Sequence, residues 1–199
     1  SYAHIYAPVD SWVKTESDPL NLGPGVPSTR RRNVEAVQAL EQAALETPGI
    51  EGVALRYGTF YGPDTAYADD GSIAHLVRIR HLPIVGDGRG TTSFVHVDDA
   101  AAATLKVLTG PTGVYNIVDD EPAPRSAWVP FYAEVLGAPA PRHVPAWLIR
   151  MLGREHFIYR SSEQRGASNA RARRDLSFDP CFRSWRDGFR AELAQKVAA

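Results

Sequence analysis

Residues 53–63 read Val-Ala-Leu-Arg-Tyr-Gly-Thr-Phe-Tyr-Gly-Pro. The apolar run at the start of this segment predicts a buried strand over 50–57, and Gly58, Gly62 and Pro63 predict that it ends in a loop. Ligands of open parallel α/β sheets lie beyond the carboxyl ends of the strands. The aromatic and hydroxyl side chains after this strand are therefore candidates for a binding site, although a turn that merely covers the core has the same pattern.

The segments around this strand alternate between strand and helix patterns. Upstream we expect a short strand at 1–6, a surface loop at 10–27 and a helix at 28–46 that Ser28 or Thr29 caps. Downstream the patterns predict helices at 72–81, 100–108, 128–136, 168–176 and 185–197, strands at 82–85, 92–97 and 114–118, and a second apolar segment at 147–152. Buried strands alternating with helices indicate an α/β fold with a parallel sheet.

The composition is that of a soluble globular protein. The chain has 199 residues, 44% of them hydrophobic and 23% charged, with a net charge of −1. Nothing in this balance favours binding to nucleic acid or to a membrane. Cys181 is the only cysteine, which excludes a disulfide framework and favours a reducing, cytoplasmic compartment. The opening residues read like the middle of a longer protein, so we expect a missing upstream segment.

Five segments in the right order carry a resemblance to a known family. Residues 55–63 are one, and the others are Ser1-Tyr-Ala-His-Ile-Tyr6, Pro83-Ile-Val-Gly-Asp-Gly88 with Phe94-Val-His-Val-Asp-Asp99, Tyr115-Asn-Ile117, and 169–176 near Pro180. Together they resemble the extended short-chain dehydrogenase/reductase group, the NAD-dependent epimerase/dehydratase family. The resemblance implies a Rossmann-type parallel sheet, here only its later strands, with a smaller C-terminal α+β substrate lobe.

The resemblance also implies a division of labour along the chain. Residues 1–62 would end the dinucleotide-binding domain, and 63–199 would form the substrate lobe, with a segment at 97–118 returning to the sheet. It implies NAD or NADP as cofactor, a small-molecule substrate, and a homodimer through the helix at 28–46. Missing first strands would also expose a sheet edge, which predicts self-association or pairing with another chain. The residues expected to bind cofactor are Tyr57, Gly58, Thr59 and Phe60.

Two parts of the family's machinery are absent from the sequence. None of the 16 glycines has the spacing of a dinucleotide-binding fingerprint. The Tyr-x-x-x-Lys pair, in which a lysine one helical turn on lowers the pKa of a catalytic tyrosine, is also missing. If Glu41 is the glutamate that follows this pair in the family, Asn33 occupies the tyrosine slot and Val37 the lysine slot. Tyr2 occupies the slot of the catalytic serine, where it could replace the missing phenol or pack on the next strand.

The substrate contacts that the resemblance implies are altered as well. The family's asparagine after the strand is Thr59, and the arginine that would grip a diphosphate is Thr92. Arg89 is a candidate replacement for that arginine. With Tyr61 and His96 these residues form the expected substrate site, which favours a small or apolar substrate over a nucleotide-diphosphate sugar.

Several other polar residues have a structural interpretation beside a functional one. His4 and His96 titrate near neutral pH in the unperturbed state, but within strands a hydrogen-bonded structural role is favoured. Asp98 and Asp99 precede a helix, which favours capping and anchoring of a loop over acid–base work. The run Arg30-Arg31-Arg32 opposes the helix macrodipole and could bind phosphate, although a solvated face is the default.

The sequence leaves two classes of function open. The first is an atypical NAD(P)-dependent oxidoreductase or epimerase-like enzyme acting on a small carbonyl, alcohol or sugar-like substrate. The second is a catalytically silent dinucleotide- or metabolite-binding module, or a truncated inactive fragment of such an enzyme. No spacing of His, Cys, Asp or Glu predicts a metal site.

Overall fold

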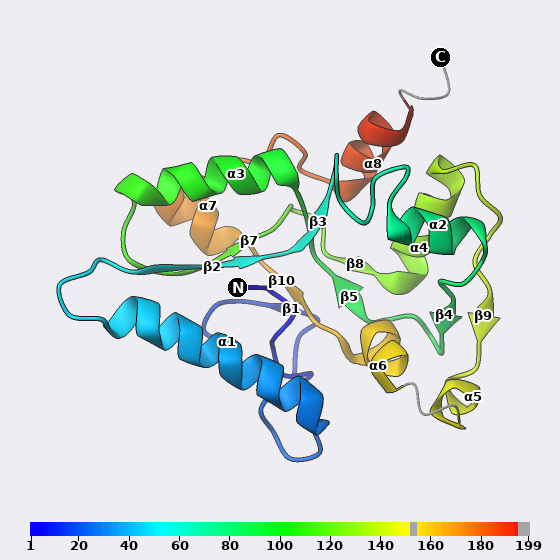
Figure 1. Cartoon of the computed structure of the whole chain (residues 1–199), viewed down its shortest axis with the longest axis horizontal. Coiled ribbons are helices and arrows are strands. Elements are labelled where there is room, and N and C mark those ends of the chain that lie inside the picture. Colours follow the sequence, from blue (N-terminus) through cyan, green and yellow to red (C-terminus); the bar gives the residue numbers. More distant parts are fainter. Residues whose placement is uncertain (152–154, 195–199) are drawn as a thin grey trace.

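The computed structural model describes residues 1–151 and 155–194 and has a parallel strand pair between helices at its centre (Figure 1). β2 (Val53–Tyr57) pairs in parallel with β7 (Gly113–Ile117), and Leu55 lies opposite Tyr115. Branched and aromatic side chains suit such a buried sheet. The predicted α/β fold with a parallel sheet is confirmed.

Helices cover both faces of this pair (Figure 1). On one side, α1 (Ser28–Glu46) buries Val34 and Val37 against Ile5. On the other side, α3 (Val97–Lys106) and α7 (Ala170–Leu176) pack against the strands through Ala100, Ala103, Ala172 and Leu176. The small alanine side chains let α3 lie close to the sheet.

A second core combines aromatic rings with aliphatic side chains. β3 (Thr59–Tyr61) pairs in parallel with β6 (Phe94–His96). The helices α2 (Ser72–Arg78), α4 (Arg125–Val135) and α8 (Trp185–Ala194) contribute side chains to this core beside the two strands. We call it the aromatic cluster, and its rings belong to Tyr61, Tyr67, Phe94, Trp128, Tyr132, Trp185 and Phe189.

Short strand pairs join distant segments. β1 (Val13–Lys14) pairs in parallel with β10 (Gly166–Ala167), β4 (Ile84–Val85) in parallel with β9 (His143–Val144), and β5 (Thr91–Thr92) in antiparallel with β8 (Ala123–Pro124). The remaining elements are α5 (Ala146–Met151), α6 (Glu155–Ile158), the 3-10 turn η1 (Val107–Thr109) and the π-helical turn η2 (Tyr159–Glu163).

Some local predictions are wrong. Residues 1–6 do not form a continuous strand, because Tyr2 bridges to Tyr57 and Tyr6 to Leu20 with a turn between them. The strand expected at 92–97 is split into β5 and β6. The segment predicted as a loop at 10–27 contains β1.

The predicted helix caps also need correction. Pro27 stands at the N-cap of α1, where no side chain accepts a hydrogen bond, so neither Ser28 nor Thr29 caps it. His96 caps α3, since its Nδ1 accepts the Asp98 amide at 3.2 Å. Asp99 does anchor a loop, as its carboxylate accepts the amides of residues 181 and 182.

Two predicted segments extend past the described residues. The ends of 147–152 and 185–197 lie outside them. α5 begins one residue before the first predicted segment, and α8 falls within the second. Over the described ranges, no helix combines the length and the apolar character needed to span a bilayer.

Candidate functional site

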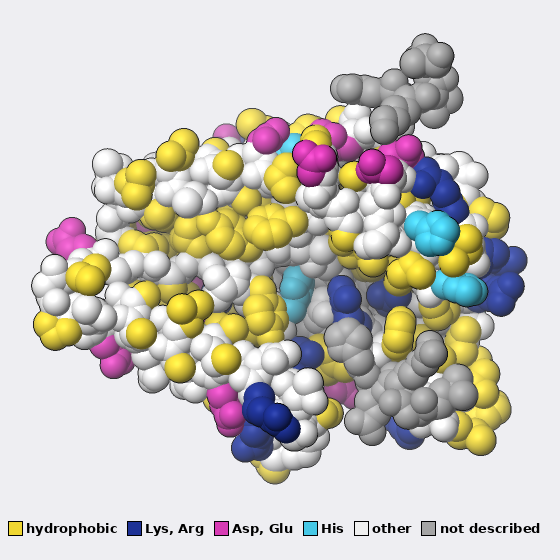
Figure 2. Space-filling model, viewed as in Figure 1, with side chains coloured by type: hydrophobic (Ala, Val, Ile, Leu, Met, Phe, Trp, Pro, Cys, Tyr) yellow, Lys and Arg dark blue, Asp and Glu magenta, His cyan; other side chains and the backbone are white. Residues whose placement is uncertain are grey.

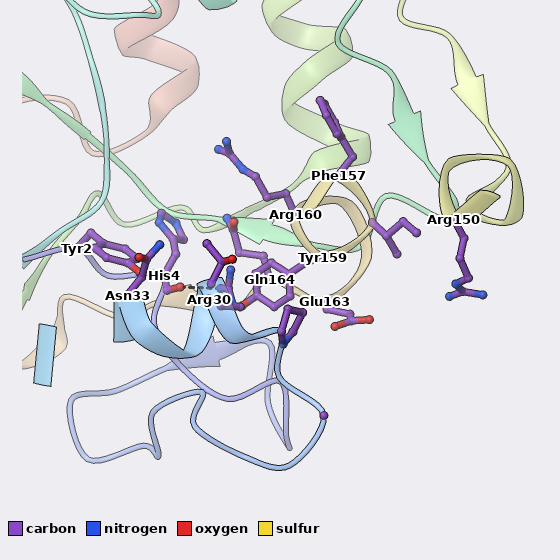
Figure 3. Close-up of a pocket in the computed structure, with 14 residues that line it drawn as sticks. Tyr2, His4, Arg30, Asn33, Arg150, Phe157, Tyr159, Arg160, Glu163 and Gln164 are labelled. Atoms are coloured by element: carbon purple, nitrogen blue, oxygen red, sulfur yellow. Dashed lines mark hydrogen bonds between the residues drawn. The ribbon is translucent and has the colours of Figure 1, made fainter. Parts of the chain in front are cut away.

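A pocket of about 850 Å³ opens where α1, the opening segment and the π-helical turn meet (Figure 3). Tyr2, His4, Arg30, Asn33, Tyr159 and Gln164 lie close together in it, while Arg150 stands apart on the far side. The cavity is large enough for more than one small ring system.

The pocket brings together two of the three slot residues. Tyr2 is held at its edge because the amide of Ala3 donates to the Tyr57 carbonyl at 2.8 Å, beside the parallel bridge to β2. Asn33 is an exposed residue on α1 and lines the same pocket. Val37, one turn further on, is buried in the apolar cluster and does not line it.

His4 is a neutral structural histidine. Its Nε2 accepts the Ser93 amide at 3.1 Å, which leaves the ring proton on Nδ1. Burial, with the nearby charges of Arg160 and Arg30, lowers the pKa of His4 to about 3. Ser93 also joins the C-terminal part of the chain, because its hydroxyl donates to the Ala167 carbonyl and accepts the Ala167 amide.

Arg30 forms the basic side of the pocket. Its guanidinium carbon lies 3.2 Å from the centre of the Tyr159 ring, and its Nη2 donates to the His4 carbonyl at 3.1 Å. Its buried Nε has no hydrogen-bond partner among the described residues. Of the arginine run, Arg31 instead bonds the Gly23 carbonyl and Arg32 is exposed.

A buried polar network fixes α1 to the sheet behind this pocket. Glu41 accepts two hydrogen bonds from Arg56, at 2.8 and 2.7 Å. A third nitrogen of Arg56 donates to the Tyr6 hydroxyl, which in turn donates to Asn116. A bidentate pair of this kind sets both position and rotation of the helix, so Asn33 is held facing the pocket.

The residues predicted to bind cofactor after β2 lie outside the pocket lining. The Tyr57 hydroxyl bonds Thr104 at 2.6 Å, and its ring packs 5.4 Å from that of Phe60. Gly58 lies where a Cβ atom would approach the Ser93 carbonyl to 2.7 Å, so close backbone packing requires glycine there. Thr59 pairs with Phe94 in the β3–β6 sheet. Their cofactor role stays a prediction.

The predicted substrate residues are also placed away from the pocket. Tyr61 and His96 are buried side chains whose rings lie 5.2 Å apart, and burial raises the pKa of Tyr61. Arg89 is exposed beside Asp87, with its guanidinium 5.2 Å from the ring of Trp12.

Thr92 lies directly behind the pocket wall. It is buried, and its hydroxyl accepts a hydrogen bond from Gln164, which lines the pocket. The substrate role predicted for Thr92 and for the three residues above stays a prediction.

Sequence reasoning missed the wall supplied by α6 and η2. Phe157, Tyr159, Arg160 and Gln164 line the pocket, but no helix or strand period marks their segment. A weak signal existed for Arg30, because an arginine run in a first helical turn is electrostatically unfavourable unless it has another role. Among the described residues no group of acidic, histidine or cysteine side chains could hold a metal ion.

Comparison with known proteins assigns the chain to a family. Residues 4–117 match the model of the NAD dependent epimerase/dehydratase family, which is more than half of the chain. The chain belongs to this family. The resemblance seen in the sequence is therefore confirmed, together with the Rossmann-type fold.

A curated relative adds a more specific likeness. The chain is 43% identical over 196 residues to a 3-diazoavenalumate denitrifying reductase from Streptomyces sp. The match covers 96% of this chain but only 63% of that reductase, so the chain spans less than two thirds of this relative's length.

Solved structures establish the fold independently. A human epimerase family protein with NADPH has a TM-score of 0.74 at 18% identity, covering 98% of this chain and 63% of its own. The dTDP-glucose 4,6-dehydratase DesIV of Streptomyces venezuelae, with NAD bound, has a TM-score of 0.69 at 22% identity, covering 98% and 57%. At these identities the likeness shows the fold alone.

Proposed function

We propose that the full-length protein containing this chain is an NAD(P)H-dependent reductase that replaces the diazo group of a small aromatic substrate with hydrogen. The observation that carries the proposal is the pair of changed slots: Asn33 faces the pocket and Val37 is buried in apolar side chains. Neither side chain exchanges protons, so a reaction that requires only hydride fits this pocket. The 43% identity to a denitrifying reductase supports the same chemistry.

The proposed reaction balances without an acid or a base. At an aryl diazonium, hydride forms one C–H bond while one C–N bond breaks and dinitrogen leaves. The two electrons arrive with the hydride, and no proton is taken up or released. Carbonyl reduction, in contrast, needs a proton on oxygen, which the family's tyrosine and lysine would supply.

The chain's own residues fit only the reactive end of a nicotinamide cofactor. Asn33 presents an amide group beside the rings of Tyr2 and Tyr159, a setting that suits a flat ring with a carboxamide. The glycines at 88 and 90 pack against Ser126 and Ser161 of the chain itself, so they do not cradle a pyrophosphate. When bound, the reduced cofactor supplies the hydride.

Tyr2 has a positioning role in this proposal. Burial raises the pKa of its phenol above the ordinary value, which keeps the hydroxyl protonated at neutral pH. A protonated phenol can donate a hydrogen bond to substrate but cannot act as a base. Asn33, with one acceptor and two donors, can orient substrate or cofactor from the facing helix.

Isotope tracing tests the proposal on the full-length protein. We expect oxidation of NADH or NADPH with an aryl diazonium such as 4-diazobenzoate, and deuterium from the C4-deuterated cofactor on the product ring. In D2O with unlabelled cofactor the product should carry no deuterium. Tyr2→Phe should keep kcat within about threefold, since no proton transfer is lost. Carbonyl reduction that depends on Tyr2 would refute the proposal.

The changed slots also favour a second candidate, a silent dinucleotide-binding module. It predicts that NADH or NADPH binds with a measurable heat while no diazonium, carbonyl or alcohol is turned over. Calorimetry followed by the turnover assay separates the two functions.

We also expect the full-length protein to be a homodimer, since α1 leaves the large apolar side chain of Leu40 60% exposed. Analytical ultracentrifugation of wild type and Leu40→Glu tests this expectation. A monomeric wild type would contradict it.

A further inference from the structure

We propose that Arg30 and Arg160 form a carboxylate-binding site, so that the substrate of this pocket is a planar organic acid. The identity of the reaction rests on the proposed function above, whereas the acid-binding site rests on the pocket alone. The site is built from the first helical turn of α1 and from the π-helical turn η2, which meet only in the folded chain.

Arg30 is held in place without a countercharge. The Tyr159 ring lies 3.2 Å beneath its guanidinium carbon, and the His4 carbonyl takes one of its N–H groups. Both contacts fix the plane of the guanidinium, and its buried Nε has no hydrogen-bond partner among the described residues. An arginine oriented in this way is suited to bind a carboxylate through two parallel hydrogen bonds.

Arg160 adds a second positive charge to the same space. Arg160 lines the pocket, and its charge, like that of Arg30, lowers the pKa of His4. Arg125 lies near it, buried, and donates to the Pro83 carbonyl. In Figure 2 basic side chains and a histidine gather in a hollow on this face of the molecule.

The described part of the chain does not neutralise these charges. For the side chains of residues 1–151 and 157–193, no ion pair within 4.0 Å involves Arg30, Arg125 or Arg160. Glu163 lines the pocket, but its carboxylate points away from Arg30 (Figure 3). Because partly buried charges are costly without a partner, an anionic ligand is the group that completes this pocket.

The remaining lining indicates that the acid is flat. The rings of Tyr2, His4, Phe157 and Tyr159 border the cavity, and such walls favour planar conjugated molecules. A phosphate would satisfy the same arginines, so carboxylate and phosphate must be told apart by experiment. The resemblance implied a diphosphate-binding arginine at position 92, but Thr92 stands there and its hydroxyl is bonded to Gln164. The loss of that arginine favours a carboxylate ligand over a phosphate.

Calorimetry on the full-length protein tests the site with three probes: cinnamate, its uncharged amide cinnamamide, and pyrophosphate. Cinnamate should bind wild type, and Arg30→Gln and Arg160→Gln should each weaken it about 10- to 100-fold, the loss typical of a charge-assisted contact. Cinnamamide should bind weakly and equally to all variants. Arg32→Gln is the matched control, since Arg32 is exposed on the same helix and lies outside the pocket.

The outcomes are independent of catalysis, because binding is measured without turnover. If cinnamate binds through Arg30 and Arg160 but no diazonium is reduced, the acid site stands and the proposed reaction falls. Absence of cinnamate binding to wild type, cinnamate affinity in both arginine variants equal to that of wild type, or a selective loss of pyrophosphate binding would overturn the site. Thermal unfolding of each variant, with Arg160→Gln as the second probe, separates misfolding from lost contacts.

Discussion

Arg30 belongs to α1, and Arg56 forms an ion pair with Glu41 of the same helix. The two arginines differ in whether the fold supplies a carboxylate for their charge. Arg56 is buried with a bidentate carboxylate and a tyrosine hydroxyl, so its hydrogen-bonding groups are engaged within the fold. Arg30 has an aromatic ring, a carbonyl and an unpaired Nε. The contrast indicates that Arg56, which is paired with a carboxylate of the protein, stabilises the fold. Arg30, which is oriented without such a partner, is suited to bind an anionic ligand.

The largest effect on stability should come from breaking the ion pair between Glu41 and Arg56. Glu41→Gln leaves the charge of Arg56 buried without its countercharge, which should lower the free energy of unfolding by about 3–5 kcal/mol. Urea unfolding measures this, with Glu35→Gln, an exposed position on the same helix, as control. A loss below about 1 kcal/mol for Glu41→Gln would show that the pair is not structural.

Restoring the family's tyrosine and lysine at positions 33 and 37 should change stability by very different amounts, because Asn33 is exposed and Val37 is buried. Val37→Lys places an ammonium group among Ile5 and Val34 and should cost about 2–4 kcal/mol of stability. Asn33→Tyr adds a ring to an exposed position that faces the pocket, so we expect a change within about 0.5 kcal/mol. Equal unfolding midpoints in the two variants would contradict the placement of Val37.

Asp119 offers the reverse case, a buried carboxyl that forms no ion pair with a described residue. Burial raises its pKa well above the ordinary 3.8, so the protonated form is favoured in the folded state. This contribution to stability is fully present below the unfolded pKa and is lost as pH rises through the folded pKa. Asp119→Asn should therefore be more stable than wild type at pH 8, with the difference vanishing near pH 3.

Urea unfolding across pH measures this effect, which we expect to be smaller than that of Val37→Lys. Asp70→Asn, at an exposed carboxylate, is the matched control and should show no such trend. A wild type that gains stability over Asp119→Asn as pH rises would reverse the assignment.

The smallest effect on stability should come from replacing Arg30, which lines the pocket. Arg30→Gln removes the contact with Tyr159 and one hydrogen bond to a carbonyl, so we expect a loss of about 1 kcal/mol or less. The same variant should lose most of its cinnamate affinity. A loss of 3 kcal/mol or more in urea would place Arg30 in the scaffold with Arg56.

Much of the fold could be read from the sequence, because hydrophobic periodicity reports local burial. The helix at 28–46 and the strand ending at Tyr57 follow from it directly. The family resemblance, counted back from Glu41, also pointed to Asn33, which lines the pocket. The predicted continuous strand at 1–6 failed because isolated bridges depend on distant partners.

The basic wall of the pocket could not be read in this way. Tyr159 and Arg160 belong to a π-helical turn without a periodic pattern, and their partner Arg30 is far away in the sequence. Their meeting depends on packing of the C-terminal part of the chain against α1. A strand end rich in tyrosine drew attention instead to Tyr61, whose ring fills the aromatic cluster.

Ser93 has a consequence for the order of folding. This one residue ties the opening segment through His4 and the last third of the chain through Ala167. Contacts between such remote segments form slowly, because the intervening loop must close first. During synthesis, the cavity therefore cannot take shape until residues beyond 167 have left the ribosome, and nascent chains halted earlier should remain open to proteases.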